Sequence, residues 1–265
     1  MFPSSHIVKK TAALSMRENY MNLFTGSCFV TFSFLFCTLV SALVYTVFGN
    51  LAGNAVMVAV ILFLVCPLLL GRLYFVRRML WGQKDKPVLV FHYFSSGKLY
   101  LHALSFTVKI LVRALAVGIL FSIPSFTANL LSDNAFYLRF GSTMPSWAPN
   151  LWVLSSLLSV AAAIGVFFVM AKYFSAPFIF VANEEISETE AIKLSLSVSK
   201  NCFSDFIWFT LSMLGWIVLC IFAIPFPFVE PYLASTYSVF CRFALAHNNK
   251  IADKVGETSA PTFEP

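Results

Sequence analysis

The sequence predicts an all-α polytopic membrane protein: a bundle of about six transmembrane helices with one or two interfacial amphipathic helices. The 265 residues are 59% hydrophobic and 11% charged, whereas a soluble domain carries about 25% charged residues. The mean hydropathy is +0.81. The apolar residues are gathered in long runs, each near the ~20 residues that cross a ~30 Å hydrocarbon layer at 1.5 Å per residue.

Six such runs are the candidate spans, at about residues 28–48, 55–75, 105–126, 151–171, 206–224 and 228–246. Lipid offers no water to the backbone, so each run must satisfy its own N–H and C=O groups as a helix. A β-barrel would need alternating polar and apolar residues, which these runs lack. We therefore interpret residues 1–248 as one integral membrane domain and residues 249–265 as a polar, disordered C-terminal tail.

The distribution of basic residues predicts the orientation. With six spans both termini share one side, and that side holds fifteen Lys and Arg residues against one, Arg139, on the other. Under the positive-inside rule both termini are then cytoplasmic, in the cell membrane. The fifteen are Lys9, Lys10, Arg17, Arg72, Arg77, Arg78, Lys84, Lys86, Lys98, Lys172, Lys193, Lys200, Arg242, Lys250 and Lys254. The first apolar run is too long for a signal-peptide core and is expected to remain as the first span.

Residues 186–203 are predicted to form a surface helix. Ser187 followed three residues later by Glu190 is a capping-box pattern. Ile192 and Leu196 then share one side and Lys193 and Lys200 another. Two interpretations fit this periodicity equally: an interfacial helix on the inner leaflet, or a cytoplasmic extension of the fifth span.

A weak internal repeat accompanies these helices. Residues 14–24 and 196–206 match at Leu, Ser, Asn and Phe, and each copy is followed by a later helix with a proline, Pro67 or Pro231. Residues 94–103 resemble a degenerate middle copy. This pattern suggests three repeats of a surface helix plus a helical hairpin, although four matches in eleven positions also fit shared composition.

Lys109 and Arg113 are the candidate site residues, for contact with a lipid headgroup or an anion. They are four residues apart in the third run, so they lie on one helical face. No acidic residue stands in a span core to pair with them. Either both side chains extend to the phosphates of the inner leaflet, or they form a buried anion or lipid-headgroup site.

No motif for catalysis, metal binding or a cofactor is present. The six cysteines form no C-x-x-C pair, and the four histidines (His6, His92, His102 and His247) have no metal-ligand spacing. The carboxylates Glu184, Glu185, Glu188 and Glu190 are interpreted as ordinary acids near a helix N-terminus. The net charge of +6 lies between apolar runs, so we read it as a topology signal and expect no nucleic-acid partner.

Several short motifs carry a family resemblance. They are Ala176-Pro177-Phe178-Ile179-Phe180, Glu190-Ala191-Ile192 with Ser195, Phe209-Thr210-Leu211-Ser212-Met213-Leu214-Gly215-Trp216, Pro231-Tyr232 and Phe240, with Pro67, Gly71, Phe91 and Gly97-Lys98 before them. Over about residues 14–245 the chain resembles the bacterial multi-pass membrane protein family called domain of unknown function 975. The resemblance implies a bacterial membrane protein. It brings no established activity and assigns no functional residues.

The expected function is that of a non-enzymatic scaffold or accessory subunit that binds lipid or a partner protein, with a homo-oligomer as a further possibility. The alternative is a small membrane transporter or channel. A polar cavity at mid-membrane favours transport, because substrate sites of transporters lie there. A fully packed bundle favours the scaffold.

Overall fold

A computed structural model describes residues 3–83, 85–139, 143, 145–220 and 225–256. Within these ranges the chain forms helices and no strand, which confirms the predicted all-helical class. Four segments are helical, long and apolar enough to cross a membrane: Tyr20–Phe48, Asn50–Leu80, Gly97–Ser132 and Leu151–Ala182. They correspond to the first four predicted spans. The predicted total of six is not confirmed.

The chain divides into two compact units, where the sequence analysis treated residues 1–248 as one domain. Residues 1–108 and 173–265 form the first unit, and residues 109–172 the second. The long helix α5 (Gly97–Ser132) begins in the first unit and continues into the second. The second unit also contains α6 (Asn134–Arg139), η3 (Ala148–Asn150) and α7 (Leu151–Met170), and η4 (Ala171–Tyr173) follows α7.

The first unit holds the remaining helices. They are α1 (Ser5–Arg17), α2 (Tyr20–Phe48), α3 (Asn50–Val60), the π-helix η1 (Ile61–Val65), α4 (Cys66–Leu80), the 3₁₀ helix η2 (Pro87–Phe94), α8 (Ala176–Ala182), α9 (Glu188–Ser212), α10 (Leu214–Leu219), α11 (Phe226–Ala246) and α12 (Asn249–Val255).

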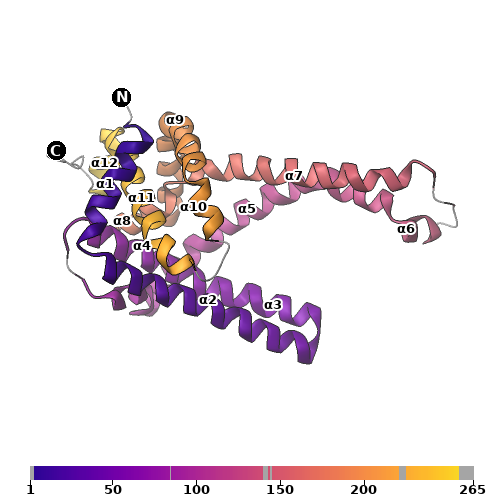
Figure 1. The fold of residues 1–265 in the computed structure, drawn as a ribbon, viewed down its shortest axis with the longest axis horizontal. Helices are drawn as coiled ribbons and strands as arrows, with labels where there is room; N and C mark the ends of the chain where they lie inside the picture. Colours follow the sequence, from indigo (N-terminus) through magenta and orange to yellow (C-terminus); the bar gives the residue numbers. More distant parts are fainter. Residues whose placement is uncertain (1–2, 84, 140–142, 144, 221–224, 257–265) are drawn as a thin grey trace. The chain divides into compact units, whose positions relative to one another are not determined.

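Helices α2 and α3 form a hairpin and lie side by side (Figure 1). Gly49 makes the turn at φ 85°, in the left-handed region that favours glycine. Large apolar side chains near the turn are exposed, with Phe48 at 73% and Leu51 at 87%. This end of the hairpin has no protein cover within the described chain, as expected of a segment that lies in lipid.

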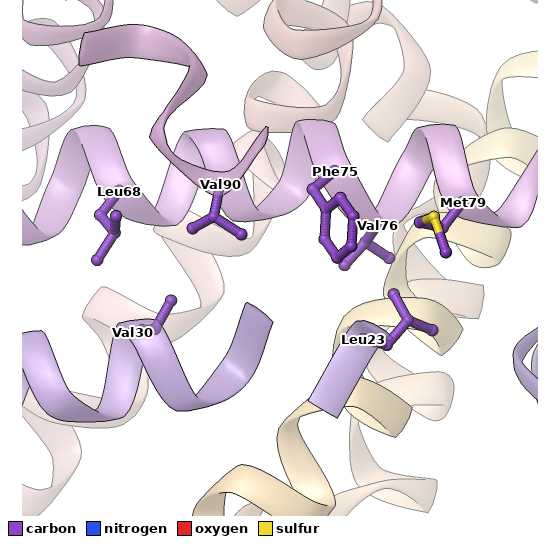
Figure 2. Close-up of a cluster of buried hydrophobic side chains, with 7 residues drawn as sticks. All are labelled: Leu23, Val30, Leu68, Phe75, Val76, Met79 and Val90. Atoms are coloured by element: carbon purple, nitrogen blue, oxygen red, sulfur yellow. The ribbon is translucent and has the colours of Figure 1, made fainter. Parts of the chain in front are cut away.

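The core of the first unit lies at the other end of the hairpin. Figure 2 shows seven buried side chains from α2, α4 and η2 that pack together: Leu23, Val30, Leu68, Phe75, Val76, Met79 and Val90. Gly71 makes this contact possible, because a Cβ at that position would lie 2.0 Å from the carbonyl oxygen of Val90. Only glycine lets the backbone of η2 approach α4 so closely.

Pro67 explains the irregularity that precedes α4. Proline has no N–H, so the carbonyl four residues earlier, that of Phe63, receives no helical hydrogen bond from it. The chain widens to the π-helix η1 directly before this point. The hydroxyl of Tyr100, on the first turn of α5, donates to the Phe63 oxygen at 2.9 Å. The broken helical bond is therefore replaced by one that ties α5 to the Ile61–Val65 segment.

Helix α9 begins as predicted, with the Ser187 hydroxyl accepting from the Glu190 N–H at 3.3 Å. The helix is continuous to Ser212, which agrees with an extension toward the fifth apolar run. Residues 249–265 were predicted to be a disordered tail. In the structure Asn249–Val255 form α12, with Ala252 and Val255 buried, and residues 257–265 lie outside the described chain.

In the second unit, residues 109–132 of α5 run antiparallel to α7. The Ser155 hydroxyl donates to the carbonyl of Ser125 at 3.0 Å. A Cβ at Gly165 would meet the Phe121 ring at 2.4 Å, so the absence of a side chain at Gly165 makes room for this ring of α5. Small residues thus form the face of α7 that packs on α5, a common solution for membrane helices.

Candidate functional site

A buried ion pair joins three helices of the first unit. The Nη2 atom of Arg72, on α4, donates to Oε2 of Glu230 on α11 at 2.9 Å. The same nitrogen donates to the Ser27 hydroxyl at 2.8 Å and to the Leu23 carbonyl at 3.1 Å, both on α2. Ser27 in turn donates to Glu230. One nitrogen and one carboxylate oxygen therefore connect α2, α4 and α11.

The Arg72 side chain is 2% exposed and that of Glu230 is 14% exposed. Nε and Nη1 of Arg72 are buried with no hydrogen-bond partner in the part of the chain that the structure describes. The guanidinium lies 5.8 Å from the centre of the Phe75 ring, which offers some cation–π stabilisation. Burial of a charge is costly unless it is paired, so Glu230 is the group that makes a buried Arg72 tolerable.

The sequence analysis missed this pair. It grouped Arg72 with the basic residues of the inner connections and found no acid in a span core. In the structure Arg72 is buried on α4, and Glu230 lies about one turn into α11. A signal was present: Arg72 is the single charge in run 55–75, and Glu230 is the single acid in any of the six runs. Opposite charges in two apolar runs are expected to meet.

Two histidine–glutamate pairs join η2 and the start of α5 to the segment around the α9 N-terminus. Nε2 of His92 lies 2.9 Å from Oε1 of Glu184, and Nδ1 of His102 lies 2.9 Å from Oε1 of Glu188. The His92 ring also stacks on Tyr74, with centroids 4.2 Å apart. The glutamates expected to serve only the helix N-terminus thus also hold η2 and α5 in place.

Lys109 and Arg113 lie one turn apart on α5, and both are half-buried. Nη1 of Arg113 donates to the carbonyl of Lys109 at 2.7 Å, so the guanidinium folds back along its own helix. The prediction that these two residues contact a lipid headgroup or an anion stays untested by this geometry.

No group of three His, Cys, Asp or Glu side chains within the described ranges could hold a metal ion. Arg72 and Glu230 meet inside a packed interior, an arrangement suited to pinning helices together. We compared the chain with protein-family models, with curated proteins and with solved structures, and no match was found.

Proposed function

We propose that this chain is a non-enzymatic scaffold or accessory subunit of a membrane, which binds lipid or a partner protein through the exposed side of its helices. The observation that carries the proposal is one face of α7. Val153, Leu157, Val160 and Ile164 follow one another at spacings of four, three and four residues, and each is at least 52% exposed. This is the spacing of a helix–helix seam.

The opposite face of α7 explains why this row is available. Ser155 and Ala162 are the buried residues of α7, and Ser155 donates a hydrogen bond to α5. Small residues of α7 are therefore buried, and its branched apolar residues are exposed. In the most apolar window of Gly97–Ser132 only 6% of the residues are buried, and in that of Leu151–Ala182 only 11%. Such surfaces need acyl chains or another helix to cover them.

The proposal includes the orientation and the membrane. Both termini face the cytoplasm of a bacterial cell, as the basic residues and the family resemblance favour. Four spans and six spans give the same orientation, because both numbers are even and leave the same basic residues inside. The two numbers of spans differ in the side on which the turn at Pro225 lies. With six spans the turn lies outside the cell membrane, and with four spans it lies on the cytoplasmic side.

A cysteine at that turn tests the number of spans. Pro225→Cys in a background without the six native cysteines would be labelled by an impermeant maleimide in intact cells if six spans cross. A control cysteine at Leu51, in the α2–α3 turn, should be labelled for either number. Labelling of position 51 without position 225 would establish that α10 and α11 do not carry the chain across.

The scaffold itself is tested by extraction into native-like nanodiscs, followed by mass spectrometry of the proteins recovered. We expect a stoichiometric partner whose yield falls in the variant L157A/I164A and holds in L154A, which truncates a leucine on the flank of α7. Recovery of the chain alone, with both variants unchanged, would contradict a partner on this face.

A small transporter or channel is the second candidate, and one observation favours it. The helix from Asn50 to Leu80 is irregular at η1 and carries the buried Arg72, and both broken helices and enclosed charges occur in transporters. Flux of ions or small solutes into liposomes that contain the purified chain would favour this candidate over the scaffold.

A further inference from the structure

The 3₁₀ helix η2 presents three rows of side chains, because residues three apart are eclipsed in this conformation. Val90 and Tyr93 form a buried row, at 0% and 1% exposure, in which Val90 packs against α4 and Tyr93 stacks on Phe180 of α8. His92 belongs to a second row and is held by Glu184 and by stacking on Tyr74. Two of the three rows are thus fixed by contacts within the protein.

The third row is apolar and faces outward. Val88, Phe91 and Phe94 are 65%, 37% and 36% exposed, respectively. The Phe91 and Phe94 rings contact each other with centroids 6.3 Å apart, and Phe91 also contacts Phe29 of α2 at 5.4 Å. The row therefore continues onto the apolar hairpin of α2 and α3. Since η2 cannot rotate without losing its other two rows, this surface has to be covered from outside.

A groove of about 630 Å³ opens beside Phe94. Ala59, Val60, Phe63 and Leu64 line one side of it, and Phe94, Ser96, Gly97 and Tyr100 line the other. The hydrogen bond from Tyr100 to the Phe63 carbonyl ties these two sides together. The groove is mostly apolar and lies where the exposed hairpin meets the packed core, a place that suits an acyl chain.

The charges around this surface are basic. Lys98, next to Gly97 of the groove, is exposed, and so is Lys86, which lines a second hollow of about 500 Å³ along Val88 and Phe91. Asp85 also lines that hollow, but the Arg78 guanidinium bonds its carboxylate at 2.6 Å, and the Glu184 carboxylate nearby is paired with His92, another residue of the hollow. The net charge therefore complements an anionic headgroup, and an apolar groove beside lysines fits a lipid better than it fits a water-soluble ligand.

We propose that the groove binds one acyl chain of an anionic phospholipid whose phosphate is held at Lys98, with the Val88–Phe91–Phe94 row covered by the same leaflet. This inference rests on the proposed function, of which it specifies the lipid. It places an interfacial lipid site on η2 and the first turn of α5, with residues other than Lys109 and Arg113.

The test uses the full chain in detergent with phosphatidylglycerol that carries a photoreactive diazirine on its acyl chain, and with the matching phosphatidylcholine. We expect cross-links concentrated in peptides 59–64 and 88–100, with phosphatidylglycerol retained in preference to phosphatidylcholine. K98Q should lower phosphatidylglycerol retention about fivefold, the effect of one lysine near an anionic headgroup, and leave phosphatidylcholine unchanged. K193Q, on the exposed side of α9, is the matched control.

A second variant fills the groove. Ala59→Trp should lower retention of both lipids, whereas Ala161→Trp, on the exposed side of α7, should lower neither. Cross-links spread over all apolar helices, with K98Q and A59W behaving as the parent, would overturn the proposal. The partner protein, whose recovery is expected to need Leu157 and Ile164, is measured separately for the same variants. Failure of the lipid site can therefore be distinguished from failure of the proposed scaffold function.

Discussion

Arg72 and Glu230 meet at 2.9 Å although 158 residues separate them in the sequence. Their contact joins α4 to α11, and Ser27 and the Leu23 carbonyl bring α2 to the same point. The last long helix of the chain is thereby attached to the first hairpin. Because both charges are largely enclosed, the pair adds a buried charged contact to the packing that holds α11, in which Val239 and Phe240 are also buried.

Removing one partner should destabilise the protein far more than removing both. We expect Arg72→Met or Glu230→Gln alone to lower the free energy of unfolding by about 3–5 kcal/mol, because either change leaves an uncompensated buried charge or its polar partners unpaired. The double variant R72M/E230Q should recover much of this loss. Titration with SDS of the protein in mixed micelles measures all three.

A non-additive result of this kind would confirm direct coupling between the two residues. The control K193M/D205N changes two other charges of the same unit that lie twelve residues apart on α9, about 18 Å at 1.5 Å per residue, and its effects should add. If the effects of Arg72 and Glu230 also add, the ion pair does not hold α11.

Gly71→Ala should displace η2 from α4. The new Cβ would lie 2.0 Å from the Val90 carbonyl oxygen, and backbone atoms on both sides leave little room to adjust. We expect a loss of about 1–3 kcal/mol, as for other overpacked sites. Gly118→Ala is the matched control, because nothing lies within 4 Å of its Cβ and alanine favours the helix by up to ~1 kcal/mol. Equal stability of the two variants would mean that η2 does not need its close approach.

Tyr100→Phe should cost about 1 kcal/mol, near the larger values found for hydrogen bonds between membrane helices. It removes the donor to the Phe63 carbonyl, which Pro67 leaves without its usual helical partner. In a Pro67→Ala background the helix can supply that bond, so the cost of Tyr100→Phe should shrink. The free energies of unfolding of the parent, the two single variants and the double variant test this coupling. An equal cost of Tyr100→Phe in both backgrounds would contradict it.

Periodicity and run length predicted much of the fold. The helical class, the first four apolar helices and the Ser187 cap are local properties, set by about 20 consecutive residues or by a pair three residues apart. The partners of buried charges are not local. Arg72 looked like one of several basic residues at the end of a run, and nothing near it in the sequence indicated that Glu230 would be its partner.

The rows of side chains on η2 are a second feature that the sequence alone could not predict. The alternation of Val88, Val90, Phe91, Tyr93 and Phe94 matches neither a strand nor an α-helix, and only the 3₁₀ conformation shows which of these residues share a row. Its placement depends on Gly71, which the sequence analysis named only among the residues of the family resemblance. The glycine instead serves a contact with a segment about twenty residues further along the chain.

Because of Tyr93, the free energy of unfolding should fall at alkaline pH. Burial raises the pKa of this phenol above its ordinary value of 10, and Glu184 and Tyr74 act in the same direction. The folded state therefore keeps the proton where the unfolded state releases it, so the stabilisation is complete below pH 10 and is lost as the pH rises above it. At pH 11 the loss from this group alone should be about 1 kcal/mol.

The comparison with Tyr93→Phe isolates that loss from the titration of other groups. The Tyr93 hydroxyl is buried without a hydrogen-bond partner among the described residues, so the phenylalanine variant should be as stable as the parent at pH 7 or more so. Unfolding measured at pH 8, 9, 10 and 11 should then show a steeper decline for the parent. Parallel declines in the free energy of unfolding of the two proteins would contradict the prediction. They would mean that the Tyr93 hydroxyl reaches water in the folded state and ionises there as it does in the unfolded state.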